Sequence, residues 1–467
     1  MRTRHAAAPA PRMSRTGWLF IAVMLVVLLE GALRKWVSPS LTMPLVALRD
    51  ALALYTIWYT ARLGLMPVKA LPTRLLTAWS CVVIAWGLWQ TLWLQTPPLV
   101  LAVGLRFWLL YFWFGYAAAM GMTREDYRRA ALVLLYVLIA STPLIVLQHN
   151  SPPGAFINTQ LDTEEADIFV VILGVVRPTG TFSFTLGYTT LLALAFPVAV
   201  LWPGIGPATR KSRLVFLLAF ASLLVGSVLS GSRSAIIGYG IMLAAYLLGA
   251  IWFSRGARKL YAVIALAFSG LLLVSVLAAF PGAILAMQQR FQAAAEAENF
   301  VARVLSIFAG EPEIYARLSW LGHGLGTGSN LAGYFQAGER IFALAESEPA
   351  RILLEGGWLG GLFTLLKLCV LAAGLVAAWR VAQRSFSPAP MVAWLALLIA
   401  LPTWSAIGQL TVNAMLGLLI AFVVLALRFP ALSRAPVRPA PAGRPLPGVR
   451  PGMRPGVRPR DPRLAQP

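Results

Sequence analysis

The chain has 467 residues, of which 59% are hydrophobic and 12% are charged, and its formal net charge is +22. A water-soluble fold cannot hide so large an apolar fraction, because much of any folded surface must stay wet, so lipid is the expected solvent. Lys and Arg lie between apolar runs rather than on one soluble face, which argues against a nucleic-acid partner. Cys81 and Cys369 each lie within an apolar run, and we expect neither a disulfide nor a metal site.

Apolar runs of about 20 residues recur from Trp18 to Phe429, and each is long enough to cross a bilayer as a helix. We therefore predict an all-α polytopic membrane protein with about twelve transmembrane helices. The first run has a basic start like a signal peptide but lacks a small-residue cleavage site, so it is predicted to be retained. In chain order the predicted spans are 17–37, 43–60, 75–95, 98–121, 128–148, 181–202, 212–231, 234–253, 259–280, 353–379, 390–408 and 410–428.

These spans divide the chain into five segments. A cytoplasmic N-terminal segment, 1–16, precedes the first nine spans, 17–280, which include an outer loop at about 149–180. A large periplasmic loop, 281–352, contains predicted amphipathic helices over 288–309. The last three spans occupy 353–429. The segment 430–467 repeats Pro and Arg, so we expect a disordered cytoplasmic tail.

The distribution of basic residues predicts the orientation. When the N-terminus is placed inside, every cytoplasmic connection carries Lys or Arg, whereas the outer turns near 95–98 and 405–409 carry none. We expect a multi-pass protein of the bacterial inner membrane with both termini in the cytoplasm. The hairpin 390–428 contains Pro402 and a tight turn, so one long broken segment remains an alternative there.

Charged residues in or beside the predicted spans map mainly to the outer leaflet. They are Glu30, Arg34, Lys35, Arg49, Asp50, Arg106, Arg177 and Arg233, with Lys367 as an exception near the middle of the tenth span. One interpretation is that Arg34 and Lys35 reach the headgroups, and that Glu30–Arg34 and Arg49–Asp50 are structural ion pairs. Because the acids in this group are far fewer than the cations, we instead predict that the cations bind an anionic ligand such as a pyrophosphate.

Three segments on the predicted outer side carry motifs. They are Arg177-Pro-Thr-Gly-Thr-Phe182, Ser230-Gly-Ser-Arg-Ser-Ala235, and Gly324-Leu-Gly-Thr-Gly328 followed by 346–360. Their order resembles the O-antigen polymerase/ligase superfamily over roughly 177–361, and Glu30-Gly-Ala-Leu-Arg-Lys-Trp36 resembles the start of exopolysaccharide polymerases. The resemblance implies a GT-C-like, metal-independent, inverting glycosyltransferase without a cofactor, acting on a polyprenyl diphosphate-linked oligosaccharide at the periplasmic face.

The resemblance also implies roles for particular residues. Outer arginines would bind and neutralise the diphosphate; the candidates are Arg34, Arg49, Arg106, Arg177, Arg233 and Arg351. Ligases of the superfamily carry a His-Asn pair nine residues before the Glu that matches Glu355, and here that position is Glu346. The sequence therefore leaves three candidates for the general base: Glu346, Glu348 and His323. A solvated helix start next to Pro349 is the alternative for the two glutamates, and a structural role in the loop is the alternative for His323.

The leading functional hypothesis is a polymerase that joins carrier-linked repeat units into exopolysaccharide or O-antigen. A ligase that transfers finished glycan to an acceptor is the first alternative, and a flippase or transporter of lipid-linked oligosaccharide is the second. Transporters commonly show internal repeats and midplane sites, which this chain lacks. Expected partners are the carrier-linked oligosaccharide, the lipid bilayer and a chain-length regulator, with no nucleic acid.

Overall fold

A computed structural model of the protein describes residues 13–430 apart from 160–170, 173–174, 254–256, 333–346 and most of 283–308. The described residues are mainly helical, which confirms the predicted all-α class. Their two strands form a two-residue antiparallel pair, β1 (Val171–Ile172) with β2 (Val175–Val176). The predicted tail from 431 onward and most of the predicted amphipathic segment 288–309 lie outside the described residues.

Among the described residues, ten helices are long and apolar enough to cross a membrane, so the polytopic membrane architecture is confirmed. They are α1 (Arg15–Trp36), η1 (Pro39–Leu41) with α2 (Thr42–Arg62), α3 (Leu71–Leu94), α4 (Pro98–Leu105) with η2 (Arg106–Leu110) and α5 (Tyr111–Gly121), α6 (Arg124–Asn150), α8 (Thr185–Ile205), α9 (Arg210–Leu229), α10 (Arg233–Phe253), α16 (Trp358–Ser385) and α18 (Leu410–Arg428). The other two predicted spans fall on α11 (Ala257–Ala279) and on the shorter α17 (Ala389–Thr403). The count of twelve remains a prediction. Short 3-10 helices, η3 (Phe156–Asn158) and η4 (Pro312–Arg317), lie in connections.

In two places the helices of the structure end at residues other than the predicted span boundaries. Pro402 lies inside α17, which ends at Thr403, and α18 begins only at Leu410, so the hairpin consists of two helices rather than one broken segment. The predicted tenth span, 353–379, is interrupted at Gly357, where α15 (Glu348–Gly356) ends and α16 begins. Gly357 has a φ of 54° and a Cβ there would lie 2.3 Å from the Trp320 carbonyl oxygen, so the chain must turn and only glycine fits.

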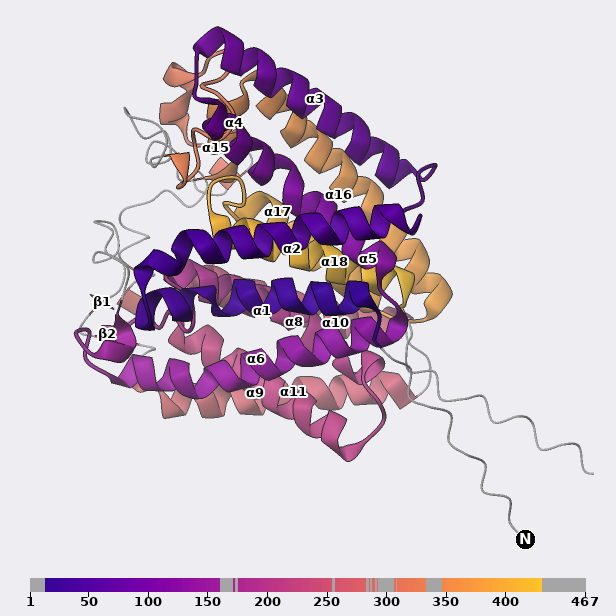
Figure 1. The fold of residues 1–467 in the computed structure, drawn as a ribbon. Coiled ribbons are helices and arrows are strands. Elements are labelled where there is room, and N and C mark those ends of the chain that lie inside the picture. Colours follow the sequence, from indigo (N-terminus) through magenta and orange to yellow (C-terminus); the bar gives the residue numbers. More distant parts are fainter. Residues whose placement is uncertain are drawn as a thin grey trace, which may run out of the picture. The chain divides into compact units, whose positions relative to one another are not determined.

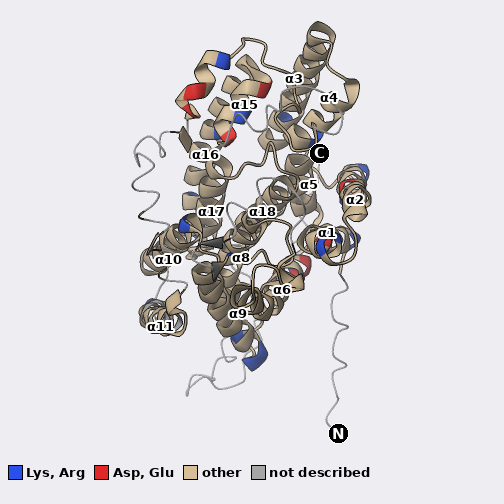
Figure 2. Cartoon of the chain, turned by 90° about the vertical axis from the view of Figure 1, so that its left-hand side faces the viewer, with Lys and Arg blue, Asp and Glu red and all other residues tan. Residues whose placement is uncertain are grey.

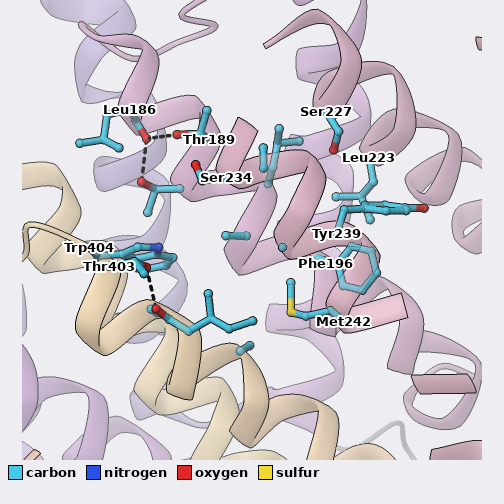
Figure 3. Close-up of a pocket in the computed structure, with 18 residues that line it drawn as sticks. Leu186, Thr189, Phe196, Leu223, Ser227, Ser234, Tyr239, Met242, Thr403 and Trp404 are labelled. Atoms are coloured by element: carbon cyan, nitrogen blue, oxygen red, sulfur yellow. Dashed lines mark hydrogen bonds between the residues drawn. The ribbon is translucent and has the colours of Figure 1, made fainter. Parts of the chain in front are cut away.

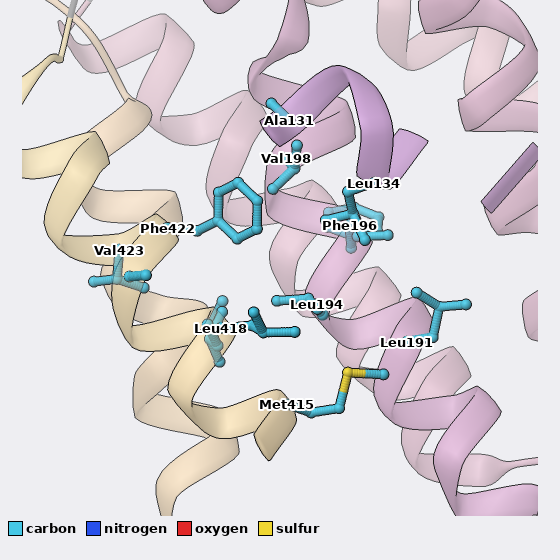
Figure 4. Packing of buried hydrophobic residues seen from close by; sticks show 14 of the residues in the cluster. Ala131, Leu134, Leu191, Leu194, Phe196, Val198, Met415, Leu418, Phe422 and Val423 are labelled. Carbon is cyan, nitrogen blue, oxygen red and sulfur yellow. The ribbon is translucent and has the colours of Figure 1, made fainter. Parts of the chain in front are cut away.

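The core lies around α8 and α18, whose most apolar stretches are 83% and 78% buried. Figure 4 shows side chains of α6, α8 and α18 meeting there, among them Leu134, Leu194 and Phe422. Helix α5 approaches α18 closely because Gly115 faces Gly417, where a Cβ would lie 2.4 Å from the carbonyl oxygen. Small residues commonly allow such close helix packing in membranes. By contrast, α2, α3 and α16 are mostly exposed, which suits contact with lipid.

One aspartate joins the beginnings of two spanning helices. Asp126 closes a capping box with Thr123 at the start of α6. It also accepts hydrogen bonds from the backbone N and Oγ of Ser14, the N-cap of α1, at 2.9 and 2.6 Å. The contacts of α1 with α2 and α6, and of α6 with α9, set these helices side by side (Figure 1).

Successive helices run in opposite directions, so the candidate residues gather at one end of the helix array. This end, which the basic residues predict to be the outer one, contains the end of α1, the start of α2 and the turn between α9 and α10. Hydrogen bonds of Lys35 with Thr179 and of Glu30 with Thr411 join the end of α1 to the segment before α8 and to the start of α18. In Figure 2, charged residues appear around α15 and near helix ends, while most of the helical length carries neither sign.

Candidate functional site

The segment that begins with Arg177 and leads into α8 is held by side chains from α1 and α6. Lys35 Nζ donates to Thr179 Oγ1 at 2.9 Å and to the Gly180 carbonyl oxygen at 2.7 Å. Gln148 Oε1 accepts a hydrogen bond from the Gly180 backbone N at 2.8 Å. Lys35 is 6% exposed, so it does not extend to the headgroups as one interpretation expected. Its amine instead fixes the segment that carries Arg177.

The turn between α9 and α10 brings a second arginine to this segment. Gly231 adopts a left-handed φ of 58°, which allows the tight turn that the sequence predicted. Arg177 Nε donates to the Ser230 carbonyl oxygen at 3.2 Å. Burial lowers the pKa of Arg177, and the neighbouring charge of Arg233 lowers it further. Two guanidinium groups so close together favour binding of an anion.

A second cluster links α1, α2 and the α4–α5 helix through buried ion pairs. Glu30 Oε1 accepts a hydrogen bond from Arg49 Nη1. Asp50 accepts from Arg106 Nε at 2.6 Å, from Arg106 Nη2 at 3.1 Å and from the Tyr111 hydroxyl at 2.8 Å. Arg49 Nε lies 3.7 Å from Asp50 Oδ1, so the four charged groups form one network. Its two acids balance its two arginines.

The predicted ion pair of Arg49 with Asp50 is confirmed, whereas Glu30 pairs with Arg49 and not with Arg34, and Arg106 binds Asp50, a pairing that the sequence did not predict. Glu30 reaches across to α2 instead of pairing along its own helix with Arg34, whose Nε donates to Thr42 Oγ1 at 2.9 Å. These long-range pairings could not be deduced from spacing within one helix. The other predicted diphosphate ligands are Arg34, Arg177, Arg233 and Arg351.

Helix α15 places a glutamate inside the protein. Glu348 lies in the first turn of α15, at the helix start that the alternative interpretation expected, but it is 4% exposed, so it is not solvated as that alternative required. Its carboxylate accepts hydrogen bonds from the Ile407 backbone N at 3.1 and 3.2 Å. Burial raises the pKa of Glu348 to about 7, although the charges of Lys367 and Arg351 oppose this rise. A carboxyl group with this pKa can exchange a proton near neutral pH.

Two polar residues that the sequence prediction missed organise the Gly-rich loop. Glu355 accepts from Trp108 Nε1 at 2.8 Å and from the Gly328 backbone N at 2.8 Å. Gln90 Nε2 donates to the carbonyl oxygens of Leu321 and Glu355 at 2.5 and 2.8 Å, and Gln90 Oε1 accepts from the Leu325 backbone N at 3.0 Å. Both residues lie inside predicted spans, and a polar side chain in a membrane span could have marked each of them as a candidate from the sequence.

Of the two other candidates for the general base, the structure describes only His323. His323 is exposed, and its Nε2 lies 3.0 Å from the Arg317 carbonyl oxygen, while its backbone N donates to the Leu354 carbonyl oxygen at 2.8 Å. These contacts agree with a role in the loop structure. Glu346 lies outside the described residues.

The connector between α17 and α18, residues 404–409, joins the separate clusters. Its Ile407 backbone N binds Glu348, and the space at Gly408 is filled by Arg351, whose Nη1 would lie 2.8 Å from a Cβ there. Immediately after the connector, Thr411 Oγ1 donates to Glu30 at 3.0 Å. The α15 cluster and the buried ion network are therefore held by the same short stretch of chain.

Comparisons with known proteins leave the family open. No protein-family model, curated protein or solved structure matches the chain. The resemblance to the O-antigen polymerase/ligase superfamily therefore remains a prediction, and the functional proposal depends on the geometry of the residues described above.

Replacing Glu355 by Gln should destabilise the protein. A glutamine has one acceptor oxygen, so its NH₂ group would face either the Trp108 or the Gly328 N–H and leave that donor unpaired, at a cost of about 1–3 kcal/mol. The thermal unfolding midpoint in nanodiscs at about pH 8, where the native carboxylate is ionised, measures this cost. The exposed Glu313→Gln is the matched control. Equal midpoints for the two variants would contradict the assigned hydrogen bonds.

The stability of the protein should fall as pH rises through the range in which Glu348 ionises. Its pKa is about 7 in the folded protein against an ordinary value of 4.5, so between these values the native state binds more protons than the unfolded state. Stability contributed by the neutral form is therefore lost as pH increases. Burial also raises the pKa of Glu355 to about 7, so Glu348→Gln should reduce but not abolish the pH dependence of the unfolding midpoint, whereas Glu313→Gln should leave it unchanged. An unchanged slope in Glu348→Gln would show that Glu348 does not titrate in this range.

Proposed function

We propose that the protein is a glycosyltransferase that polymerises polyprenyl diphosphate-linked oligosaccharide repeat units at the outer face of the bacterial inner membrane. The observation that carries the proposal is the close pair Arg177 and Arg233 at one end of the membrane-spanning array. Like charges so close together are stabilised by an anion between them, and guanidinium groups bind phosphate oxygens in bidentate fashion.

In this mechanism the two arginines hold the diphosphate of the donor as it becomes the leaving group. A hydroxyl of the acceptor sugar attacks the anomeric carbon, the bond from that carbon to the diphosphate oxygen breaks, and the configuration inverts. The arginine pair stabilises the negative charge that develops on the departing diphosphate, which is the main protein contribution to catalysis. Positioning of Arg177 by Lys35 and Thr179 prepares this charge before substrate arrives.

The base that takes the hydroxyl proton is one of the same three candidates, Glu346, Glu348 or His323. Of the two in the described part of the chain, Glu348 has a pKa near neutrality, which suits a general base. His323 is more accessible, but its ring contacts the Arg317 carbonyl oxygen. Arg351, on the same helix as Glu348, is the third arginine proposed to act at the outer end.

Substitution of Arg233 by Ala should reduce polymer formation by about 100-fold or more, because one of the charges opposite the leaving group is lost. Arg177→Ala should act in the same direction. Exposed Arg213, at the start of α9 and thus at the opposite end, gives the control Arg213→Ala, which should retain activity. Lipid-linked glycans extracted from cells that express each variant are sized to measure the effect.

The size of the carrier-linked glycan distinguishes the proposed reactions. Accumulation of single repeats in Arg233→Ala supports a polymerase, while long glycan left on the carrier would indicate a ligase. Repeats trapped on the cytoplasmic side would indicate a flippase. Normal chain lengths in both Arg177→Ala and Arg233→Ala would contradict the role of the arginine pair.

A further inference from the structure

A cavity of about 110 Å³ lies among α8, α9, α10 and α17. Figure 3 shows its lining, with Thr403 and Trp404 from the end of α17 opposite side chains of α8 and α10. Ser234 contributes to the wall, and it directly follows Arg233 in the chain. The cavity therefore starts beside the turn that carries the arginine pair.

From that turn the cavity extends toward the middle of the helices. Met242 and Phe196 line its deeper part, and both are largely buried. Both lie well within α10 and α8, more than one helical turn from the ends of these helices. The space thus runs from the proposed diphosphate position into the region that the apolar core of the membrane surrounds.

The lining suits hydrocarbon better than sugar. Its residues are apolar or carry only a hydroxyl or an indole as polar group, and no charged, amide or imidazole side chain is among those described there. Several hydroxyls are already engaged: Thr190 and Thr403 donate to carbonyl oxygens of their own helices at 2.6 Å, and Ser234 bonds Ser232 at 2.9 Å. A sugar would leave many of its own hydroxyls unpaired here, which is costly.

We propose that this cavity holds the first part of the hydrocarbon chain of the lipid carrier, next to its diphosphate. The inference rests on the proposed function, since it takes the anion at Arg177 and Arg233 as its starting point. A dry cavity of about 150 Å³ holds one benzene molecule, so this smaller cavity suits about one isoprenyl unit and not a whole polyprenyl chain. The cavity would thereby recognise a prenyl chain attached to the anion rather than the anion alone.

Two glycines of α10 provide a matched test. Gly238 lines the cavity and Gly240 does not, and for both glycines a Cβ would meet no described heavy atom within 4 Å. Leucine at either position improves the helix propensity by the same amount and requires no backbone shift. Only Gly238→Leu places its side chain at the wall of the cavity, so any difference between the two variants reports on cavity filling.

The experiment measures binding of inorganic pyrophosphate and of farnesyl diphosphate to the full chain in nanodiscs, with subtraction of binding to empty nanodiscs. Wild type and Gly240→Leu should bind farnesyl diphosphate about tenfold more tightly than pyrophosphate, because an isoprenyl unit becomes buried. Gly238→Leu should lose this difference and still bind pyrophosphate normally, which also shows that the variant is folded. Thr403→Phe, which fills the cavity from α17, is a second variant with the same expected result.

The possible outcomes separate the two proposals. If Gly238→Leu and Thr403→Phe keep the tenfold preference, or if wild type shows none because a phospholipid chain occupies the cavity, the assignment of the cavity is overturned. In both of these cases, weaker pyrophosphate binding by Arg233→Ala would leave the proposed diphosphate site intact. If Arg233→Ala binds pyrophosphate as wild type does, the diphosphate site fails, and the assignment of the cavity fails with it.

Discussion

Charge inside a membrane is costly unless it is balanced, and this constraint shapes the end of the helix array that contains Glu30, Arg49, Asp50 and Arg106. Glu30 and Asp50 are both committed to the network with Arg49 and Arg106, which ties α1, α2 and the α4–α5 helix together. A π-helical turn, Arg106–Leu110, interrupts the α4–α5 helix where this network is attached. Arg177 and Arg233 lie outside this network, and two guanidinium groups so close together suit an anionic ligand.

The position of the arginine pair depends on contacts that are distant in sequence. Lys35, on the first spanning helix, holds the segment before α8, and the turn after α9 brings Arg233 to the same segment. A lysine in place of either arginine would keep the charge but lose the planar fork that binds phosphate oxygens in bidentate fashion. The proposed binding of a diphosphate would therefore favour arginine over lysine at both positions.

Apolar run length predicted the helices well, because a spanning helix must satisfy its backbone hydrogen bonds internally and must be about 20 residues long. The tight Gly231 turn was also predictable from its glycine and short length. The pairing of Glu30 with Arg49 was not, since a helical repeat reveals neighbours within one helix but not the neighbouring helix. Gln90 and Glu355 could have been found by asking which polar side chains lie in predicted spans, whereas the break at Gly357 depends on the close approach of Trp320.

The central claim is that the charges at this end of the helix array divide into a neutral structural network and a separate binding site for a diphosphate. An electron cryo-microscopy structure in nanodiscs with undecaprenyl diphosphate tests this division directly. The account predicts phosphate density within hydrogen-bond distance of both Arg177 and Arg233, with Asp50 still bound to Arg106. Phosphate density at Arg106, with Asp50 displaced and no density near Arg233, would contradict it.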